Sequence, residues 1–472
     1  MKIKINKFII EMDSGRKMLI PNIKQIISCD DNDTIYNNCF IYVENGIIKD
    51  INSMDKINPL YTKSELIDAS DCIIYPGLIN THHHLYQTMS RNLPQTQNME
   101  LFEWLDFLFE KWKNINEEVV YYSALVGLGE LLKTGCTTCM DQNDSIPREN
   151  SRLCVDKEFS AAEKLGIRLC LGRGSLDLGP EDGNNVSPKL LQTVDEIISD
   201  SEDAIKKHHD GSFNSMKNVI LAPCAPFCSS IECYKRTAEL ARKYNVRLNT
   251  HLAETLDEEK WCKEKYNKRP LELMKECDFI GKDVFFNHGI HFNDKEIKLL
   301  GETKTGISHC PTSNMKLSSG IMKMKEMRKN KVIIGLGVDG SASNDGSNLL
   351  DEMRNCYLLH RLNESHDAPS GYEILKMATR GSSKLIGREE LGCLKIGNPC
   401  DLFMIKCKGV EMVGCDHDFK NYLCTVGHKG NVFMTIVNGK IVYKEGKLIN
   451  LPNEEEIAKK AREVEEIYLN KK

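Results

Sequence analysis

The feature that most constrains the fold is a long alternation of strand-like and helix-like segments. Short apolar runs at residues 169–175, 218–224 and 284–289 are typical of buried strands, and segments with helical spacing separate them. This alternation continues from residue 76 to residue 392. Strands that alternate with helices favour a parallel β/α architecture. We therefore predict an α/β fold built on a (β/α)8 TIM barrel, with a doubly wound sheet as the alternative.

Polar residues at the ends of apolar segments favour the barrel. His82 and His84 come directly after a short apolar run that begins at residue 78. His251 and Asp339 each end another apolar segment. In TIM barrels the active site forms at the carboxyl ends of the strands. A doubly wound sheet does not explain why polar residues recur at so many strand ends.

Both ends of the chain carry short β-rich segments that cannot form a core alone. Asn-Gly pairs at 45–46 and 438–439 lie between alternating apolar residues, which predicts two hairpin turns. We expect these strands to combine into one small β-sandwich. The predicted domains are 1–75 for the N-terminal part of the sandwich (1–22 being an extension), 76–392 for the catalytic barrel, 393–450 for the C-terminal part of the sandwich and 451–472 for a C-terminal helix.

Composition excludes several classes of protein. A net charge of −5 gives no basic footprint for a nucleic acid polymer. The chain has no apolar run of membrane-spanning length, and charged residues interrupt the short apolar run near its N-terminus. We therefore expect a cytoplasmic protein with no membrane contact. The nineteen cysteines are scattered, so we expect free buried thiols, including Cys136 and Cys139 of the one CxxC sequence.

Four of the polar strand-end residues form a plausible metal-ligand set. Side chains two apart on a strand share a face, so His82 and His84 can bind one ion while His83 points away. His251 offers a third nitrogen, and the carboxylate of Asp339, which follows apolar and Gly residues, needs a partner or a metal. Three histidines and one aspartate suit a catalytic site with an open position. We predict one divalent ion, Zn²⁺ by default, with Fe²⁺, Co²⁺ or Mn²⁺ as alternatives.

The order of short motifs resembles that of the amidohydrolase superfamily. These motifs are PGLINTHHH from residue 76, HLAE from 251, NHGIH from 287 and GVDGSASND from 337. The branch that they resemble contains the cytosine and guanine deaminases and the chlorohydrolases. Within it, HHHLYQTMSRN, RGSLDLG, LAPCAPF and HCPTSNMKL together resemble the 8-oxoguanine deaminase subgroup. The resemblance extends over residues 25–445 and implies the same barrel-plus-sandwich arrangement.

The resemblance also implies roles for individual residues. Glu254 matches the glutamate that carries a proton to a ring nitrogen of the substrate. His288 matches the histidine that polarises the attacking water and the leaving group, and Asp339 matches the aspartate that accepts a proton from that water. Substrate contacts are implied for Gln87, Trp104 and Arg173. Supporting positions around the site are implied for His309, Asn314 and Ser341.

The activity implied is that of a metal-dependent hydrolytic deaminase that uses metal-activated hydroxide and releases ammonia. The expected partner is a small heterocycle, an aminated N-heterocyclic free base, with an 8-oxoguanine-like purine favoured. Guanine, isoxanthopterin or another pterin, and hydroxy-s-triazines are the alternatives. Residues 111–116 lack the acid with which nucleoside-acting relatives hold ribose, which favours a free base. Relatives of this kind are commonly oligomers, so we also expect a homo-oligomer.

Two other classes of function are alternatives. A ring-opening cyclic amidohydrolase would need two metals bridged by a carboxylated Lys on the fourth barrel strand. We assign that strand to residues 169–175, where Arg173 stands instead of Lys. A binding protein with an inactive barrel is disfavoured because the set of histidine, glutamate and aspartate residues is intact.

Overall fold

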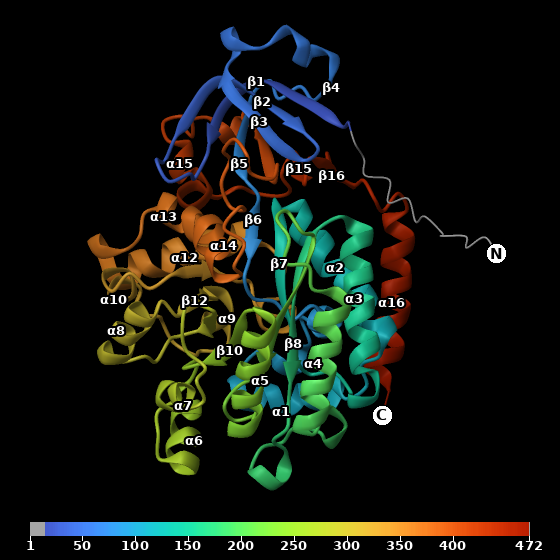
Figure 1. Ribbon diagram of the computed structural model, residues 1–472, viewed down its shortest axis with the longest axis vertical. Coiled ribbons are helices and arrows are strands. Elements are labelled where there is room, and N and C mark those ends of the chain that lie inside the picture. The colour runs from blue at the N-terminus through green and yellow to red at the C-terminus, as the bar shows by residue number, and fades with distance from the viewer. Residues whose placement is uncertain (1–14, 472) are drawn as a thin grey trace, which may run out of the picture.

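A parallel barrel and a mixed sheet organise the computed structural model, which describes residues 15–471 (Figure 1). The eight barrel strands are hydrogen-bonded in chain order from β6 to β13. They are β6 (Leu78–Asn80), β7 (Cys136–Asn143), β8 (Arg168–Ser175), β9 (Lys217–Pro223), β10 (Leu248–Leu252), β11 (Val284–His288), β12 (Gly306–His309) and β13 (Ile334–Leu336). The predicted TIM barrel is confirmed, and the doubly wound alternative is wrong.

The barrel closes just beyond the end of its first strand. The backbone N–H of Thr81 donates to the carbonyl of Leu336 at 3.0 Å, and that of Asp339 donates to the carbonyl of His82 at 3.0 Å. These bonds join the segment after β6 to the segment after β13. The first and last metal-ligand candidates are therefore held side by side by the backbone.

Helices surround the barrel and connect its strands (Figure 1). Those of the barrel are α1 (Leu101–Trp112), α2 (Glu117–Lys133), α3 (Ser151–Leu165), α4 (Val194–His208), α5 (Ile231–Tyr244), α6 (Leu256–Tyr266), α7 (Pro270–Glu276), α8 (Asp294–Thr303), α9 (Pro311–Lys316), α10 (Met324–Lys329), α11 (Ser341–Asn344), α12 (Leu349–Glu364), α13 (Gly371–Lys376) and α14 (Ser382–Leu385). Ser230 caps α5 by accepting a hydrogen bond from the Cys233 N–H at 3.1 Å, as its position before the apolar pattern predicts. In the part of the chain that the structure describes, no helix is long and apolar enough to cross a membrane.

The barrel interior is filled with side chains except at one end. Its lower layer consists of apolar side chains from several of the strands, among them Ile79, Met140, Ile220 and Phe285. Because this layer excludes water, only the carboxyl ends of the strands are left for a site.

Strands from both ends of the chain form the mixed sheet. It contains β1 (Lys17–Ile27), β2 (Ile35–Glu44), β3 (Ile47–Ser53), β4 (Glu65–Leu66), β5 (Cys72–Pro76), β14 (Leu402–Lys406), β15 (Met434–Val437), β16 (Lys440–Lys444) and β17 (Lys447–Leu448). β5 joins the two halves, since it pairs with β1 on one side and with β14 on the other. The helices α15 (Phe419–Tyr422) and α16 (Glu454–Asn470) complete the C-terminal region. The β-domain made from both chain ends is confirmed, and its nine strands are linked in one sheet.

Both predicted Asn-Gly turns are present. Asn45 and Gly46 have φ values of 50° and 77°, and Asn438 and Gly439 have values of 49° and 68°. Positive φ at both central residues is what a two-residue hairpin turn of type I′ requires. The two turns also touch, because a Cβ on Gly439 would lie 2.8 Å from the Gly46 Cα.

Two expectations from the sequence need correction. Strand β1 begins at Lys17, so the predicted extension over residues 1–22 ends earlier than expected, and its residues 1–14 lie outside the described part of the chain. Residues 169–175 belong to β8, the third barrel strand, and the fourth is β9. The cysteines are free as expected, and all but Cys407 are buried.

Candidate active site

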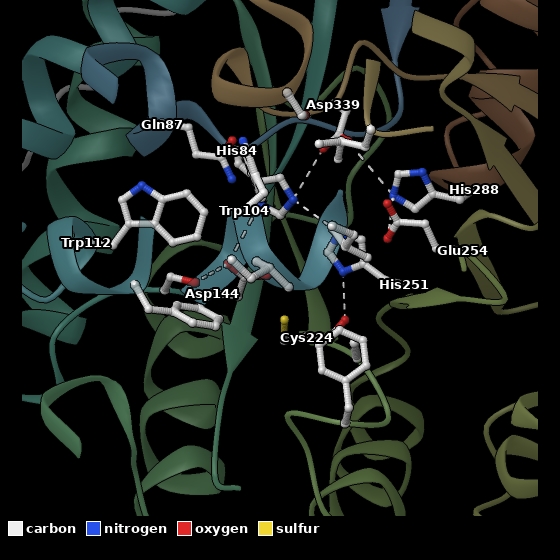
Figure 2. A pocket seen from close by; sticks show the side chains of 18 of the residues that line it. His84, Gln87, Trp104, Trp112, Asp144, Cys224, His251, Glu254, His288 and Asp339 are labelled. Atoms are coloured by element: carbon white, nitrogen blue, oxygen red, sulfur yellow. Dashed lines mark hydrogen bonds and ion pairs between the residues drawn. The ribbon is translucent and has the colours of Figure 1, made fainter. Parts of the chain in front are cut away.

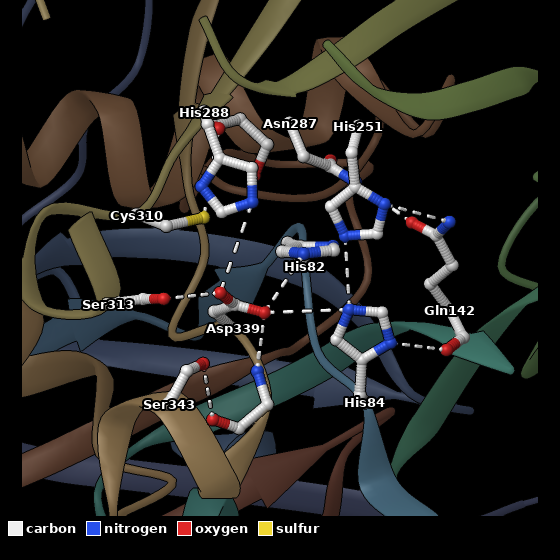
Figure 3. A network of polar contacts seen from close by, with 12 residues as sticks. His82, His84, Gln142, His251, Asn287, His288, Cys310, Ser313, Asp339 and Ser343 are labelled. Carbon is white, nitrogen blue, oxygen red and sulfur yellow. Dashed lines mark hydrogen bonds and ion pairs between the residues drawn. The ribbon is translucent and has the colours of Figure 1, made fainter. Parts of the chain in front are cut away.

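Side chains from the first, fifth and last barrel strands converge above the apolar interior of the barrel (Figure 3). His82 and His84 follow β6, while the neighbouring His83 points away and its Nε2 lies 2.9 Å from the Ser347 hydroxyl. His251 comes from β10, and Asp339 follows β13. His82, His84, His251 and Asp339 each offer one ligand atom, and these four atoms lie within 4.8 Å of one another.

The contacts of His84 and His251 show which ring nitrogens face the centre. The Nδ1 of His84 donates to the Gln142 carbonyl at 2.8 Å, and the Nδ1 of His251 donates to the Cys224 carbonyl at 2.7 Å. In the neutral rings, each Nε2 then carries a lone pair, and the two Nε2 atoms are 3.1 Å apart. Two facing lone pairs repel unless a cation lies between them. Backbone carbonyls that orient metal-binding histidines in this way are typical of metal sites.

His82 and Asp339 complete the set. Both ring nitrogens of His82 are buried and lack a hydrogen-bond partner in the described structure, although Nε2 lies 3.1 Å from the Asp339 carboxylate. Burial lowers the pKa of His82 well below its usual value and that of His251 to about 4, so both rings are neutral ligands near pH 7. Burial opposes the ionisation of Asp339, but the adjacent histidines, His82 first, hold its pKa well below the ordinary range.

Three neutral imidazoles and one carboxylate fit a divalent transition metal such as Zn²⁺. The unpartnered nitrogens of His82 and the facing lone pairs of His84 and His251 are the observations that require a cation. The predicted ligand residues are therefore brought together in an arrangement that could hold one ion.

Backbone torsion angles are strained at residues that carry or directly precede side chains of this pocket. His288 and Asp339 have φ values of 70° and 66°, and Ala253, directly before Glu254, has a φ of 55°. Non-glycine residues rarely adopt such values, which cost free energy and cluster at functional sites. The left-handed conformation turns each side chain from the end of its strand into the pocket.

Glu254 and His288 lie together beside the ligand set. The Glu254 carboxylate is 3.6 Å from His288 Nε2, which is itself 4.0 Å from the Asp339 carboxylate. Burial, together with the negative charge of Asp339, raises the pKa of Glu254 well above its ordinary value. Burial therefore favours the protonated form of Glu254, the form that could donate a proton to a bound molecule.

The pocket in front of these groups is narrow and largely aromatic (Figure 2). Its empty space, counted together with the part open to solvent, is about 470 Å³. Its apolar wall is formed by Tyr86, Leu101, Trp104, Leu105, Phe109, Trp112, Phe227 and Leu317. The side-chain oxygen of Gln87 and the indole N–H of Trp104 are buried in this wall and have no hydrogen-bond partner among residues 15–471. Both residues predicted to contact the substrate line this pocket, and flat aromatic walls suit a planar ring.

Arg173 is not brought to this pocket. Its guanidinium donates to the Ser151 hydroxyl at 3.1 Å and to the Gln192 side chain, and it forms an ion pair with Asp200 at 3.4 Å. These partners belong to the outer layer around α3 and α4, where Arg173 lines a different cavity. The expectation that Arg173 contacts the substrate is therefore not supported by its position.

The three residues expected in supporting positions differ in their contacts. The side-chain oxygen of Asn314 lies 2.8 Å from His288 Nδ1, so Asn314 supports the site directly. His309 is paired with His360 instead, with their Nε2 atoms 3.0 Å apart. The hydroxyl of Ser341 is 3.2 Å from that of Ser347, behind the ligand set.

Several functional residues were not recognised from the sequence. Gln142, Asn249 and Asn287 form a buried amide network under the ligands, in which Asn287 donates to Gln142 at 2.9 Å. Glu258 accepts hydrogen bonds from the backbone N–H groups of Ala253 and Glu254, at 3.0 Å and 2.9 Å, and so fixes the strained turn. Four consecutive polar residues at 141–144, ending an apolar segment, are the feature from which the amide network could have been predicted.

Comparison with known proteins agrees with this geometry. The model of the amidohydrolase family matches residues 73–442. The chain belongs to the amidohydrolase family. It is similar to 8-oxoguanine deaminase from Pseudomonas aeruginosa, with 39% identity over 80% of this chain and 84% of the relative. It is also similar to hydroxydechloroatrazine ethylaminohydrolase from Pseudomonas sp. strain ADP, with 34% identity over 84% of this chain and 83% of that relative.

A solved structure extends the comparison of this amidohydrolase to the metal. Atrazine chlorohydrolase TrzN from Arthrobacter aurescens TC1, complexed with zinc, superimposes with a TM-score of 0.90 at 27% identity. The alignment covers 95% of this chain and 100% of that one. The family, the barrel and the buried ligand set together identify a hydrolase.

Proposed function

We propose that this amidohydrolase removes the amino group from a neutral, aminated N-heterocyclic free base, with an 8-oxoguanine-like purine as the favoured substrate. The observation that carries the proposal is that Glu254, a buried carboxyl whose pKa burial raises, lies beside the metal-ligand set in one aromatic pocket. Hydrolysis of an amino-heterocycle needs an activated water and an acid for the ring nitrogen. The names of the two sequence relatives, a deaminase and an aminohydrolase, support the same class.

The side chains divide the chemistry among them. A divalent ion, for which we propose Zn²⁺, supplies a water of lowered pKa when it is bound by the three histidines and Asp339. Asp339 accepts one proton of the water that attacks the amino-bearing carbon. Glu254 gives its proton to the adjacent ring nitrogen, and His288 orients the water and the departing amine. The C–N bond then breaks, ammonia leaves with the proton from Asp339, and the second water proton restores Glu254.

The pocket wall supports a neutral substrate. None of the described residues that line it is a Lys or an Arg. A substrate with a carboxylate or phosphate would lose its hydration without gaining an opposite charge, which is costly. A free base buries only a planar ring with a few polar edges and avoids this cost. Pterins and hydroxy-s-triazines share these properties and are the alternatives within the same reaction class.

The residues of β9, which is the fourth barrel strand, disfavour a function in the ring opening of a cyclic amide. The carboxyl end of β9 is followed by Cys224, and the lysine of this strand, Lys217, stands at its opposite end. A carboxylated Lys that bridges two metals has no position there. We also expect the homo-oligomer implied by the resemblance, which sedimentation in solution will test.

The first prediction concerns Glu254. Zinc-loaded protein should release ammonia from at least one base in a panel of oxidised and unmodified purines, pterins and hydroxy-s-triazines. Glu254→Gln removes the proton but keeps the size of the side chain, so we expect a loss of about 10²- to 10⁴-fold in kcat. Glu264→Gln, an exposed change on helix α6, which follows Glu254 in the chain, is the matched control and should keep full activity. Ring-opened products without ammonia would overturn the proposed function.

A further inference from the structure

We infer that Asp144 is a specificity-determining residue, whose carboxylate selects heterocycles that present a ring N–H at the edge facing it. The inference rests on the proposed function, because it names the class of base that the same pocket takes. It assigns a second polar contact to the substrate besides the acid and the metal-ligand set.

Asp144 directly follows β7 and is buried in the pocket wall (Figure 2). Only 3% of its side chain is exposed. One carboxylate oxygen, Oδ1, accepts hydrogen bonds from the Tyr86 hydroxyl at 2.7 Å and from the Ser145 hydroxyl at 3.2 Å. Among the described residues, none donates an N–H or a conventional O–H bond to the other oxygen, Oδ2. Asp144 therefore has one oxygen held in place by the protein and one available to a ligand.

No strong counter-charge accompanies this carboxylate. Within residues 15–471, His84 is the one basic side chain within 4.0 Å of it, and the distance from His84 Nδ1 is 3.7 Å. That nitrogen already donates to the Gln142 carbonyl. A buried carboxylate with two hydroxyl donors and no Lys or Arg is incompletely compensated, so a donor from outside the chain stabilises it.

The position of Asp144 indicates which part of the base it meets. The Asp144 carboxylate lies on the Nδ1 side of the His84 ring, while the Nε2 of that ring faces His251 and Asp339. Trp112 packs edge-on against Tyr86 and Trp104, with ring centroids 5.4 Å and 5.5 Å away, and makes the adjoining wall rigid. A planar base held at the metal by its amino-bearing carbon therefore presents a remote edge to Asp144. An N–H on that edge donates to Oδ2, whereas an N-methyl group or an anionic oxygen does not.

A role as a metal ligand is the competing interpretation. An oxygen of Asp144, the Cys224 sulfur and a ring nitrogen of His251 lie within 4.8 Å of one another. However, the Nδ1 of His251 already donates to the Cys224 carbonyl, and its Nε2 faces His84. His251 has no nitrogen left for a second ion. The geometry thus favours a contact with the substrate.

A methyl scan of the base tests the inference. The probes are 8-oxoguanine and its 7-methyl and 9-methyl derivatives, each of which lacks one ring N–H. Their kcat/KM values are compared between the wild type and Asp144→Asn, and their affinities are measured by calorimetry in the Glu254→Gln background. Asn keeps the Oδ1 acceptor and replaces Oδ2 with a donor. We expect the wild type to prefer the N–H base over one methyl derivative by about 10- to 100-fold, and Asp144→Asn to lose most of that preference.

The controls separate the possible failures. Asp416→Asn, an exposed carboxylate in the C-terminal region, makes the same chemical change away from the pocket and should keep the wild-type preference. An unchanged preference in Asp144→Asn, or the loss of a bound metal equivalent in that variant, would overturn the inference. If the wild type releases no ammonia, the proposed function fails, while the calorimetric comparison still tests Asp144.

Discussion

At the residue scale, the site depends on the protonation of a few buried groups. In the mechanism that we propose, the ligand histidines must be neutral and Glu254 must be protonated, and these requirements conflict in water near pH 7. Burial resolves the conflict, because it lowers the pKa of His82 and His251 and raises that of Glu254. The same low-dielectric pocket thus prepares the ligands and the acid together.

The prediction for single residues concerns the zinc content that follows from the metal-ligand assignment. Protein loaded with zinc and then dialysed should retain one equivalent per chain. His251→Ala removes one of the two facing Nε2 atoms, so we expect its zinc content to fall well below one equivalent under the same conditions. Elemental analysis measures both values.

His291→Ala provides the matched comparison for that measurement. His291 lies outside the ligand set, and its Nε2 is 2.8 Å from the Ser319 carbonyl. This variant should keep its zinc. Equal zinc contents in the two variants would contradict the assignment.

At the element scale, a buried carboxyl pair joins α3 to β7. Asp141 accepts a hydrogen bond from the Leu85 N–H at 2.6 Å, and Glu158 accepts one from the Asn143 side chain at 2.7 Å. Their other oxygens, Asp141 Oδ2 and Glu158 Oε1, are buried, and no other group in the described part of the chain donates a hydrogen bond to them. Burial and the neighbouring carboxyl raise the pKa of Asp141, and burial raises the pKa of Glu158 to about 7. The pair therefore keeps a proton that the unfolded chain releases at lower pH.

The contribution of this carboxyl pair to the stability of the fold should consequently fall as the pH rises from about 4.5 to 7. In this window the unfolded state binds fewer protons than the folded state, so each pH unit costs up to about 1.4 kcal/mol of unfolding free energy. Glu158→Gln provides a permanent N–H donor to Asp141 in place of the shared proton. We expect its thermal midpoint, relative to the wild type, to increase over this range. Parallel curves for the two proteins would show that no proton is shared.

At the scale of the whole molecule, the mixed sheet ties the two chain ends to the barrel. The Arg168 guanidinium at the start of β8 donates to both carboxylate oxygens of Asp401, at 2.7 Å and 2.9 Å, and both side chains are buried. The Asp401 carboxylate also accepts the backbone N–H of Asn438 at 2.8 Å. This network fixes the C-terminal hairpin against the third barrel strand.

The prediction for the whole molecule concerns the contact between the two hairpin turns. Gly439→Ala places a Cβ 2.8 Å from the Gly46 Cα in addition to straining a residue with a φ of 68°. Gly446→Ala is the matched control, because its φ is 88° and nothing lies within 4 Å of the added Cβ. Gly446→Ala should lower the free energy of unfolding by about 1 kcal/mol through backbone strain alone. Urea unfolding should show a larger loss for Gly439→Ala, and equal losses would mean that the turn contact contributes nothing.

The sequence by itself determined the barrel, the two-ended β-domain and the metal-ligand set. These follow from local periodicity, because apolar runs that end in His or Asp deliver their polar side chains to the same edge of a parallel barrel. His82, His84, His251 and Asp339 could be grouped without knowing any distance, since strand order alone brings their ends together.

Only the tertiary structure decided the direction of Arg173 and the environment of Asp144. Arg173 turns outward because Asp200 on α4 offers it a partner, and Asp144 faces the pocket with a hydroxyl from Tyr86 holding one oxygen. Each pairing joins segments that are remote in sequence and lie on different elements. Local patterns define the elements but do not encode which side chains of neighbouring elements meet, because that depends on how the helices and loops pack around the barrel.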